Sequence, residues 1–281
     1  MNLRIIRKKI KSIGNVKKIT KAMQLVSAIK MKKAQIKAIE SMPYRNFLNL
    51  AILKSINLIN KNYSPLLTSH TKNGKKLLIV ISSNKGLCGY FNFSIFKFLI
   101  KEDLKNSDFI ILGKKARFFI NKIGGKIIAD FSHINFDIAT SPIFSESLRL
   151  FLGGDYEKVY LIYNHFINSL KFETVKQLIL PTKLEDRKNI QMNNKEYIIE
   201  PDPNQVINEV LKNLVEEEIR GAIIESEAAE HSARMMAMKN ATDNANEIIY
   251  NLTLLRNKVR QERITNELLD MVSTKISVEG N

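Results

Sequence analysis

The chain has 281 residues, of which 44% are hydrophobic and 26% charged, with only 6 Pro and 11 Gly, and these values indicate a folded globular protein of one or two domains. The longest strictly apolar run, Leu77 to Ile81, is far shorter than the roughly 20 residues that a membrane-spanning helix needs, so we expect no transmembrane helix. The single cysteine, Cys88, excludes an intramolecular disulfide and a cysteine-based metal cluster.

The net charge of +16 is unevenly distributed along the chain. Residues 1–40 hold 12 basic residues and one acidic residue, whereas residues 205–281 hold 9 basic and 13 acidic residues. A strongly basic segment predicts nucleic acid, an anionic membrane surface or an acidic protein as partner. The first 40 residues contain no Phe, Tyr or Trp, the side chains on which single-stranded bases stack, and this argues against nucleic acid.

The first predicted element is a long amphipathic helix from Leu3 to about Asn57. Its apolar residues recur every three or four positions, at Ile6, Ile10, Ile13, Val16, Ile19, Met23, Val26 and Ile29. Pro43 lacks an amide donor and clashes with the preceding turn, so we expect a kink or interruption near Ser41 to Met42.

The middle of the chain, from about Lys75 to Pro203, reads as short β-rich runs separated by helical stretches. The predicted strands are Leu77 to Ile81, Phe109 to Leu112, Lys126 to Ala129, Val159 to Tyr163 and Thr174 to Leu180. The predicted helices are Phe91 to Lys105, Lys115 to Ile123 and Ser145 to Leu152. Alternation of this kind predicts a layered α/β domain with mostly parallel strands.

The last predicted element is one very long helix that follows Pro201-Asp202-Pro203 and runs to about Ile276. Its apolar or small residues recur with a period close to 3.5, at Leu211, Val215, Ile219, Ala222, Ser226, Ala229, Ala233, Met236, Leu254, Ile264, Leu268 and Met271. Such a seam needs a partner helix, and the basic N-terminal helix would place opposite net charges side by side. Because the helix is longer than a compact domain, we expect part of it to protrude.

These elements predict an α/β fold in which a long antiparallel coiled coil of the N- and C-terminal helices carries an inserted α/β (Rossmann-like) domain. The predicted boundaries are 1–60 for the N-terminal helix, 75–203 for the central domain and 204–281 for the C-terminal helix.

We find no convincing catalytic, cofactor or metal site. In the loop Ser83 to Gly89 only two residues separate Gly86 from Gly89, whereas a phosphate-binding P-loop has four and then Gly-Lys-Ser/Thr. Cys88 has no histidine near it in sequence, so a small buried residue is the better interpretation. The histidines stand alone, without the spacing of a helical metal site, at His70, His133, His165 and His231.

Several motifs together resemble the gamma subunits of F-type ATP synthases, over almost the whole chain. The longest is Glu230 to Ala245, EHSARMMAMKNATDNA, which resembles the C-terminal signature of that family. The other segments that resemble it are Ile10 to Ile13, Lys18 to Met23, Gly86 to Gly89 with Asn92, Gly113 to Arg117, Tyr163 to Asn168, Glu200 to Pro203, and Asn257 to Gln261 with Ile264, Thr265, Glu267 and Leu268.

The resemblance implies a central-stalk rotor subunit that catalyses no reaction itself and needs no cofactor. Its implied partners are the alpha and beta subunits of a hexameric ring, the epsilon subunit and the ring of c subunits. By motif correspondence, Arg260 and Gln261 would hydrogen-bond a loop of a beta subunit, and Lys21 and Met23 would face the lower lever of beta. Residues from Ile264 to Ile276 would form the tip of the shaft, inside an apolar sleeve.

Two alternatives stay open at this point. A basic coiled-coil nucleic-acid-binding protein would bind DNA or RNA with strong salt dependence. An α/β enzyme using the Gly86 loop would need a phosphate-binding lysine and an acid or base. The first residues are charged but lack an apolar core, so we expect no secretory signal. The expected location is the cytoplasmic face of a bacterial inner (plasma) membrane, peripherally and only through the complex.

Overall fold

The computed structural model describes residues 3–55, 64–69, 71, 74–102, 104–182 and 202–279. In chain order the elements are α1 (Leu3–Ser55), β1 (Lys76–Ile81), α2 (Phe91–Leu99), η1 (Leu104–Asn106), β2 (Ser107–Leu112), α3 (Lys114–Lys122), β3 (Lys126–Asp130), η2 (Phe136–Ile138), α4 (Thr140–Leu152), β4 (Lys158–Asn168), β5 (Lys171–Leu180) and α5 (Pro203–Glu279). The chain divides into two compact units, of which unit 1 comprises Met1–Val26 with Met235–Asn281 and unit 2 comprises Ser27–Arg234. No helix in the described part of the chain has the length and apolar character needed to cross a membrane.

Unit 2 is built on a five-stranded sheet in the order β3-β2-β1-β4-β5. β1 pairs in parallel with β2 and with β4, and β2 pairs in parallel with β3. β5 alone runs antiparallel, because it returns from β4 through a tight hairpin. The predicted α/β sheet with mostly parallel strands is therefore confirmed.

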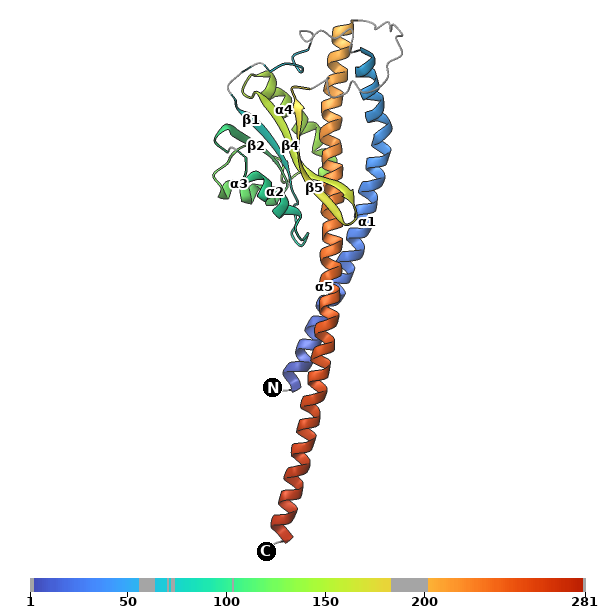
Figure 1. The fold of residues 1–281 in the computed structure, drawn as a ribbon, viewed down its shortest axis with the longest axis vertical. Helices are drawn as coiled ribbons and strands as arrows, with labels where there is room; N and C mark the ends of the chain where they lie inside the picture. Colours follow the sequence, from blue (N-terminus) through green and yellow to red (C-terminus); the bar gives the residue numbers. More distant parts are fainter. Residues whose placement is uncertain are drawn as a thin grey trace. The chain divides into compact units, whose positions relative to one another are not determined.

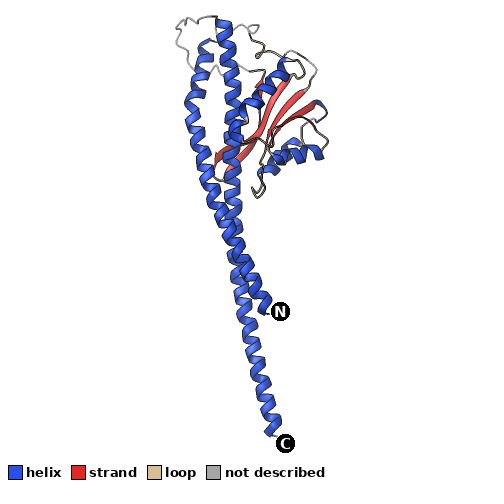
Figure 2. Ribbon diagram, turned by 180° about the vertical axis from the view of Figure 1, so that it is seen from behind, coloured by secondary structure: helices blue, strands red, loops and turns tan. Residues whose placement is uncertain are grey.

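Helices cover both faces of this sheet (Figure 2). Successive side chains of β1 alternate between the faces, as strand geometry requires. Leu77, Ile79 and Ile81 belong to a core shared with α4 and with the parts of α1 and α5 that lie in unit 2. Leu78 and Val80 belong to a second core, which is filled mainly by α2 and α3. Unit 2 is thus a three-layer α/β domain that includes the helix segments packed on one face.

The boundaries of two predicted helices in unit 2 need correction. The helix predicted over Phe91 to Lys105 ends at Leu99, and a separate short 3-10 helix, Leu104–Asn106, precedes β2. Leu99 is fully buried whereas Ile100 is exposed, so the apolar face of the helix ends there although apolar residues continue. α4 begins at Thr140 rather than Ser145, because Pro142 is tolerated in the first turn of a helix.

α1 continues as one helix past Pro43, so of the kink or interruption predicted near Ser41 to Met42 the interruption is wrong. Proline removes only one backbone hydrogen bond, and the residues after it are fixed by packing. Leu48 and Ile52, one and two turns further on, are buried in the core of unit 2. The predicted end of this helix near Asn57 lies outside the described residues, which reach Ser55.

Unit 1 is an antiparallel pair formed by the first part of α1 and the last part of α5. The N-terminal end of α1 and the C-terminal end of α5 point the same way, and α5 continues well beyond α1 (Figure 1). The side chains of Thr20 and Thr242 meet in the buried seam, with their Oγ1 atoms 2.8 Å apart. The predicted antiparallel pairing of the two terminal helices is confirmed.

The seam of α1 differs from the predicted stripe. Ile6 and Thr20 are buried with Ile13 half-buried between them, a strict seven-residue repeat. Val16 and Ile19 are instead 50% and 60% exposed, and Val26 and Ile29 are also exposed. The prediction therefore combined two stripes, the buried seam and an exposed one. Apolar residues three or four positions apart occur in both stripes, whereas the buried residues follow a seven-residue repeat.

The seam of α5 is confirmed in unit 2 and ends in unit 1. Residues Leu211, Val215, Ile219, Ala222, Ser226 and Ala229 are buried, whereas Leu254, Ile264, Leu268 and Met271 are exposed. Thr20 of α1 lies opposite Thr242 of α5, and the two helices are antiparallel. Leu3 is seventeen residues before Thr20 on α1, so it lies opposite the residue seventeen after Thr242 on α5, which is about residue 259. Every side chain from Arg260 to Ser273 is exposed, because the described part of α1, which begins at Leu3, does not reach them.

Candidate functional site

The five predicted contact residues all lie in unit 1, at two separate places. Lys21 and Met23 are on α1, beside the part of α5 near residue 240, and Lys21 is exposed while Met23 is half-buried. Arg260, Gln261 and Ile264 are on the uncovered part of α5 and are exposed. About twenty residues of helix separate the two places, which is roughly 30 Å at 1.5 Å per residue. The structure therefore places the five residues in two separate regions of unit 1 and does not bring them together.

The uncovered end of α5 is a single helix that carries large apolar side chains. Ile264, Leu268, Leu269, Met271 and Val272 are each about half exposed or more. Arg263 and Glu267 form an exposed ion pair with an Nε to Oε1 distance of 2.7 Å. An isolated helix with this much exposed apolar surface is typical of a binding element, because a solitary helix gains nothing from such residues in water.

A second exposed apolar surface in unit 1 is a stripe of α1, which the sequence analysis assigned to the buried seam. Val16, Ile19 and Val26 are exposed together on one face of α1, whereas Lys21 lies on the opposite face. A partner for the exposed stripe needs apolar groups. The signal that could have separated this stripe from the seam is the seven-residue spacing of Ile6, Ile13 and Thr20.

In unit 2 the loop between β1 and α2 presents an exposed leucine on a rigid base. Leu87 has φ 62°, in the left-handed region that is unfavourable for a branched side chain, and is 63% exposed. Beneath it, Asn92 donates through Nδ2 to Ser83 Oγ at 2.8 Å and to Cys88 Sγ at 3.1 Å. Cys88 is 2% exposed, which agrees with its interpretation as a small buried residue.

A buried arginine on α5 holds this loop from below. Arg234 donates to the carbonyl oxygens of Lys85 and Gly86 at 3.2 and 3.3 Å, and its Nη2 lies 2.7 Å from Glu230 Oε1. Both side chains of this ion pair are less than a tenth exposed. The motif Glu230 to Ala245 thus begins with a pair that fixes the loop to α5 inside unit 2.

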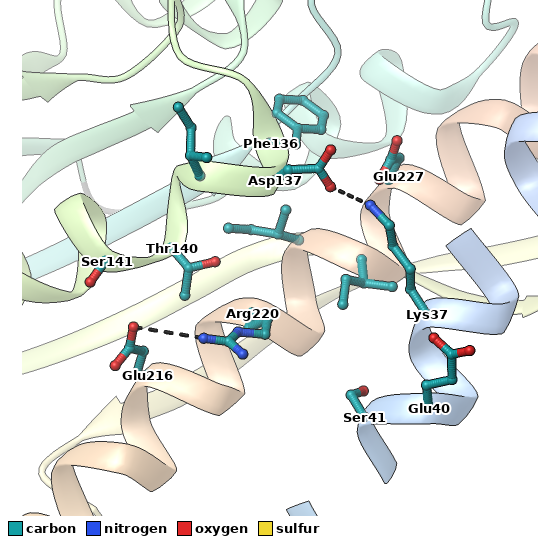
Figure 3. Close-up of a pocket in the computed structure, with 13 residues that line it drawn as sticks. Lys37, Glu40, Ser41, Phe136, Asp137, Thr140, Ser141, Glu216, Arg220 and Glu227 are labelled. Carbon is teal, nitrogen blue, oxygen red and sulfur yellow. Dashed lines mark hydrogen bonds and ion pairs between the residues drawn. The ribbon is translucent and has the colours of Figure 1, made fainter. Parts of the chain in front are cut away.

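A hollow of about 530 Å³ lies in unit 2 between α1, the η2–α4 segment and α5 (Figure 3). Four of its charged side chains form two pairs, Lys37 with Asp137 and Arg220 with Glu216. Lys37 of α1 reaches Asp137 of η2, and this hydrogen bond raises the pKa of the Lys37 ammonium. Arg220 lies 3.9 Å from Glu216 on its own helix. The pairing makes this hollow a charged junction between helices rather than a group of free acids and bases.

The described residues contain no group of three or more His, Cys, Asp or Glu side chains arranged to hold a metal ion. His133 contacts Arg117, His165 contacts Glu225 and His231 contacts Arg234, while His70 lies outside the described residues. The features that stand out in the described residues are exposed apolar side chains on a long helix pair, which are typical of proteins that bind other proteins.

Sequence comparisons identify the family. Residues 2–277 match the family model described as ATP synthase. The chain is 37% identical to the ATP synthase gamma chain of Verminephrobacter eiseniae, over 98% of both chains. It is 34% identical to the ATP synthase gamma chain of Bdellovibrio bacteriovorus, over 99% of both chains. The chain belongs to the family of ATP synthase gamma chains.

Solved structures agree with this assignment. A chain of the central stalk and c-ring of the Tetrahymena thermophila mitochondrial ATP synthase matches with a TM-score of 0.60 and 26% identity, over 79% of this chain and 99% of that chain. A chain of the Euglena gracilis mitochondrial ATP synthase matches in fold with a TM-score of 0.66 at 16% identity, over 98% of this chain and 94% of that chain.

Proposed function

We propose that this chain is the rotor subunit in the central stalk of an ATP synthase and that it couples ion flow to ATP synthesis. The observation that carries the proposal is the uncovered end of α5, together with membership of the gamma chain family. A helix pair that lacks threefold symmetry presents a different surface to each of three catalytic beta subunits as it turns. Each orientation then shifts the conformational equilibrium of each beta subunit differently. The chain itself makes and breaks no bond.

The partners in this proposal are the alpha and beta subunits of the hexameric ring, the epsilon subunit and the c-ring. The relatives are named gamma chains of ATP synthase, and the Tetrahymena structure is described as central stalk and c-ring. The alternative, a basic coiled-coil nucleic-acid-binding protein, has no support among the relatives named above.

We assign Arg260 and Gln261 to hydrogen bonds with a loop of a beta subunit, and Ile264 to the apolar tip. Their exposure on a helix without a partner in the described chain supports this assignment. An arginine with a free guanidinium face donates to carboxylate and carbonyl acceptors with defined geometry. The exposed Ile264, Leu268 and Met271 fit a sleeve that offers apolar contact without directional bonds.

We assign Lys21 and Met23 to the contact with the lower lever of beta. Lys21 is exposed on the face of α1 opposite the apolar stripe that contains Val16 and Ile19, so an acidic group on the lever would complement its charge. Met23 is half-buried, which places it at the edge of that stripe.

The proposed organisation comprises 1–60 and 204–281 as the two coiled-coil helices and 75–203 as the central domain. The proposed location is the cytoplasmic face of a bacterial inner membrane, with association only through the complex. The bacterial sources of the curated relatives support this location.

The test is assembly with the cognate alpha and beta subunits, with and without this chain. We expect one copy of the chain per ring on size-exclusion chromatography and sustained ATP hydrolysis only when it is present. The variant Arg260→Ala should assemble but change turnover, and Lys33→Ala on the exposed face of α1 is the matched control. A chain that elutes separately and binds DNA or RNA at low salt would contradict the proposal.

A further inference from the structure

Arg45 lies in unit 2 where α1, α5 and β4 meet, and it approaches α5 at a glycine. A Cβ atom built at Gly221 would lie 1.9 Å from Arg45 Nη2 and 2.9 Å from Cζ. No side chain fits at position 221 while the guanidinium occupies this place. Gly221 is the only glycine inside α5, and a glycine in a helix interior is destabilising unless its missing side chain is needed. Here the guanidinium of Arg45 occupies the space that a side chain at position 221 would need.

We call the space at Gly221 that the guanidinium occupies the notch. A carboxylate lies one helical turn away from it in each direction along α5. Glu217 and Glu225 are four residues before and four residues after Gly221, so all three lie on one face of α5. Glu225 Oε1 lies 4.0 Å from Arg45 Nη1, and the positive charge of Arg45 also acts to lower the pKa of Glu217. We call Glu217, Gly221 and Glu225 the arginine socket.

The socket is also connected to the sheet. Glu225 Oε2 lies 2.6 Å from Nδ1 of His165 on β4. The same carboxylate adds to the effect of burial in raising the pKa of Tyr163, which is also on β4. Glu225 therefore contacts Arg45 of α1 and two side chains of β4, and the three elements share one carboxylate.

We propose that Arg45 and the arginine socket form a register lock, in which the guanidinium of α1 fixes α1 against α5 and, through Glu225, fixes both helices to the sheet. A slip of α1 by one residue displaces the guanidinium by about 1.5 Å along the helix axis, out of the notch and against a side chain. Apolar seams alone resist such a slip weakly, because small and apolar residues pack in more than one register. Arg45 is thus a positioning residue that makes unit 2 resist twisting. Its consequence for energy coupling rests on the proposed function.

The first test uses the free full-length chain. It asks whether replacing a glycine by alanine raises or lowers the midpoint of thermal unfolding. Gly221→Ala displaces the guanidinium of Arg45 from its place against position 221 and away from Glu225, so the midpoint of thermal unfolding should fall rather than rise. In an Arg45→Ala background the same substitution should raise the midpoint, because alanine is the better helix former when the notch is empty. Gly14→Ala is the matched control, since nothing lies within 4 Å of a Cβ added at this mid-helix glycine, and it should raise the midpoint in both backgrounds.

The second test uses the assembled enzyme in vesicles and compares ions pumped with ATP hydrolysed. Arg45→Ala should keep hydrolysis and lower the number of ions pumped per ATP, whereas Lys33→Ala should leave the ratio unchanged. Arg45→Lys retains the charge without the planar fork, so it should not restore the ratio.

The lock is overturned if Gly221→Ala behaves like Gly14→Ala in both backgrounds, or if Arg45→Ala pumps as well as the unmodified enzyme. Failure of the proposed function gives a different result. The unmodified chain would then support no pumping, whereas the unfolding midpoints of Gly221→Ala in the two backgrounds of the free chain would still show the lock.

Discussion

The hydroxyl groups of Thr20 and Thr242 face each other at 2.8 Å in the buried seam of unit 1. Each hydroxyl has one proton, so one threonine donates to the other while its partner donates to its own helix, either Thr242 to the carbonyl of Met238 at 2.8 Å or Thr20 to the carbonyl of Lys17 at 3.0 Å. The contact is specific to one register of the helix pair, and that register determines how much of α5 lies beyond α1.

Replacing Thr20 by Val should remove this contact while keeping the shape of the side chain. We expect a loss of about 1 kcal/mol of stability, which corresponds to a midpoint lower by roughly 2–4 °C. The double variant with Thr242→Val should lose less than the sum of the two single variants. Thr265→Val, at an exposed threonine bonded to its own helix, is the control and should be neutral. Additive losses would show that the two hydroxyls do not interact.

The buried pair of Arg234 and Glu230 should contribute far more to stability than the exposed pair of Arg263 and Glu267. Arg234→Ala leaves Glu230 buried without its partner and frees the loop at Lys85 and Gly86, so we expect a loss of about 3–5 kcal/mol. Arg263→Ala should cost at most about 1 kcal/mol. Chemical denaturation of the two variants measures the difference, and equal losses would contradict the structure.

Ile219 and Ile264 are both on α5 but differ completely in burial, being 0% and 49% exposed. Ile219→Ala should lower the stability of the free chain by about 2–5 kcal/mol, because it opens a cavity in the core of unit 2. Ile264→Ala should leave the unfolding midpoint unchanged and weaken assembly with the ring instead. A loss of stability at Ile264 would mean that the end of α5 is covered in the free chain.

Glu217 predicts a dependence of stability on pH. Burial raises the pKa of this carboxyl group, and its Oε1 atom is buried without a hydrogen-bond partner. A raised folded-state pKa stabilises the fold below the unfolded pKa, and this contribution is lost as the pH rises through the folded value. The variant Glu217→Gln should therefore gain stability relative to the unmodified chain as the pH rises from 4 towards 7. A difference that does not change with pH would contradict the raised pKa.

The sequence was sufficient for the architecture because long helices and short strands have different periods. The strands around Leu78 and Ile110 and the pairing of the terminal helices followed from apolar spacing and charge alone. The direction faced by Val16 and Ile19 did not follow, since only the packing register distinguishes two apolar stripes on one helix. The end of α2 at Leu99 and the start of α4 at Thr140 depend on burial that local composition does not encode.

The exposure of the proposed contact residues was predictable in part. Exposure at Arg260 follows from the length of α5 beyond its partner, which the sequence indicated. The exposure of Leu87 requires a left-handed backbone conformation, and the socket at Gly221 requires Arg45, which is far away in sequence. Neither feature has a local sequence signal, because each depends on two segments that meet only in the folded chain.

Rotation of the chain inside the ring tests the central claim most directly. A bead attached to a cysteine introduced at the exposed Lys97 on α2 would report the motion, and Cys88 would stay unlabelled because it is 2% exposed. With the alpha and beta subunits fixed to a surface, we expect the bead to turn continuously in one direction while ATP is present and to stop when ATP is removed. A bead that only fluctuates about one angle while the ring hydrolyses ATP would contradict the account.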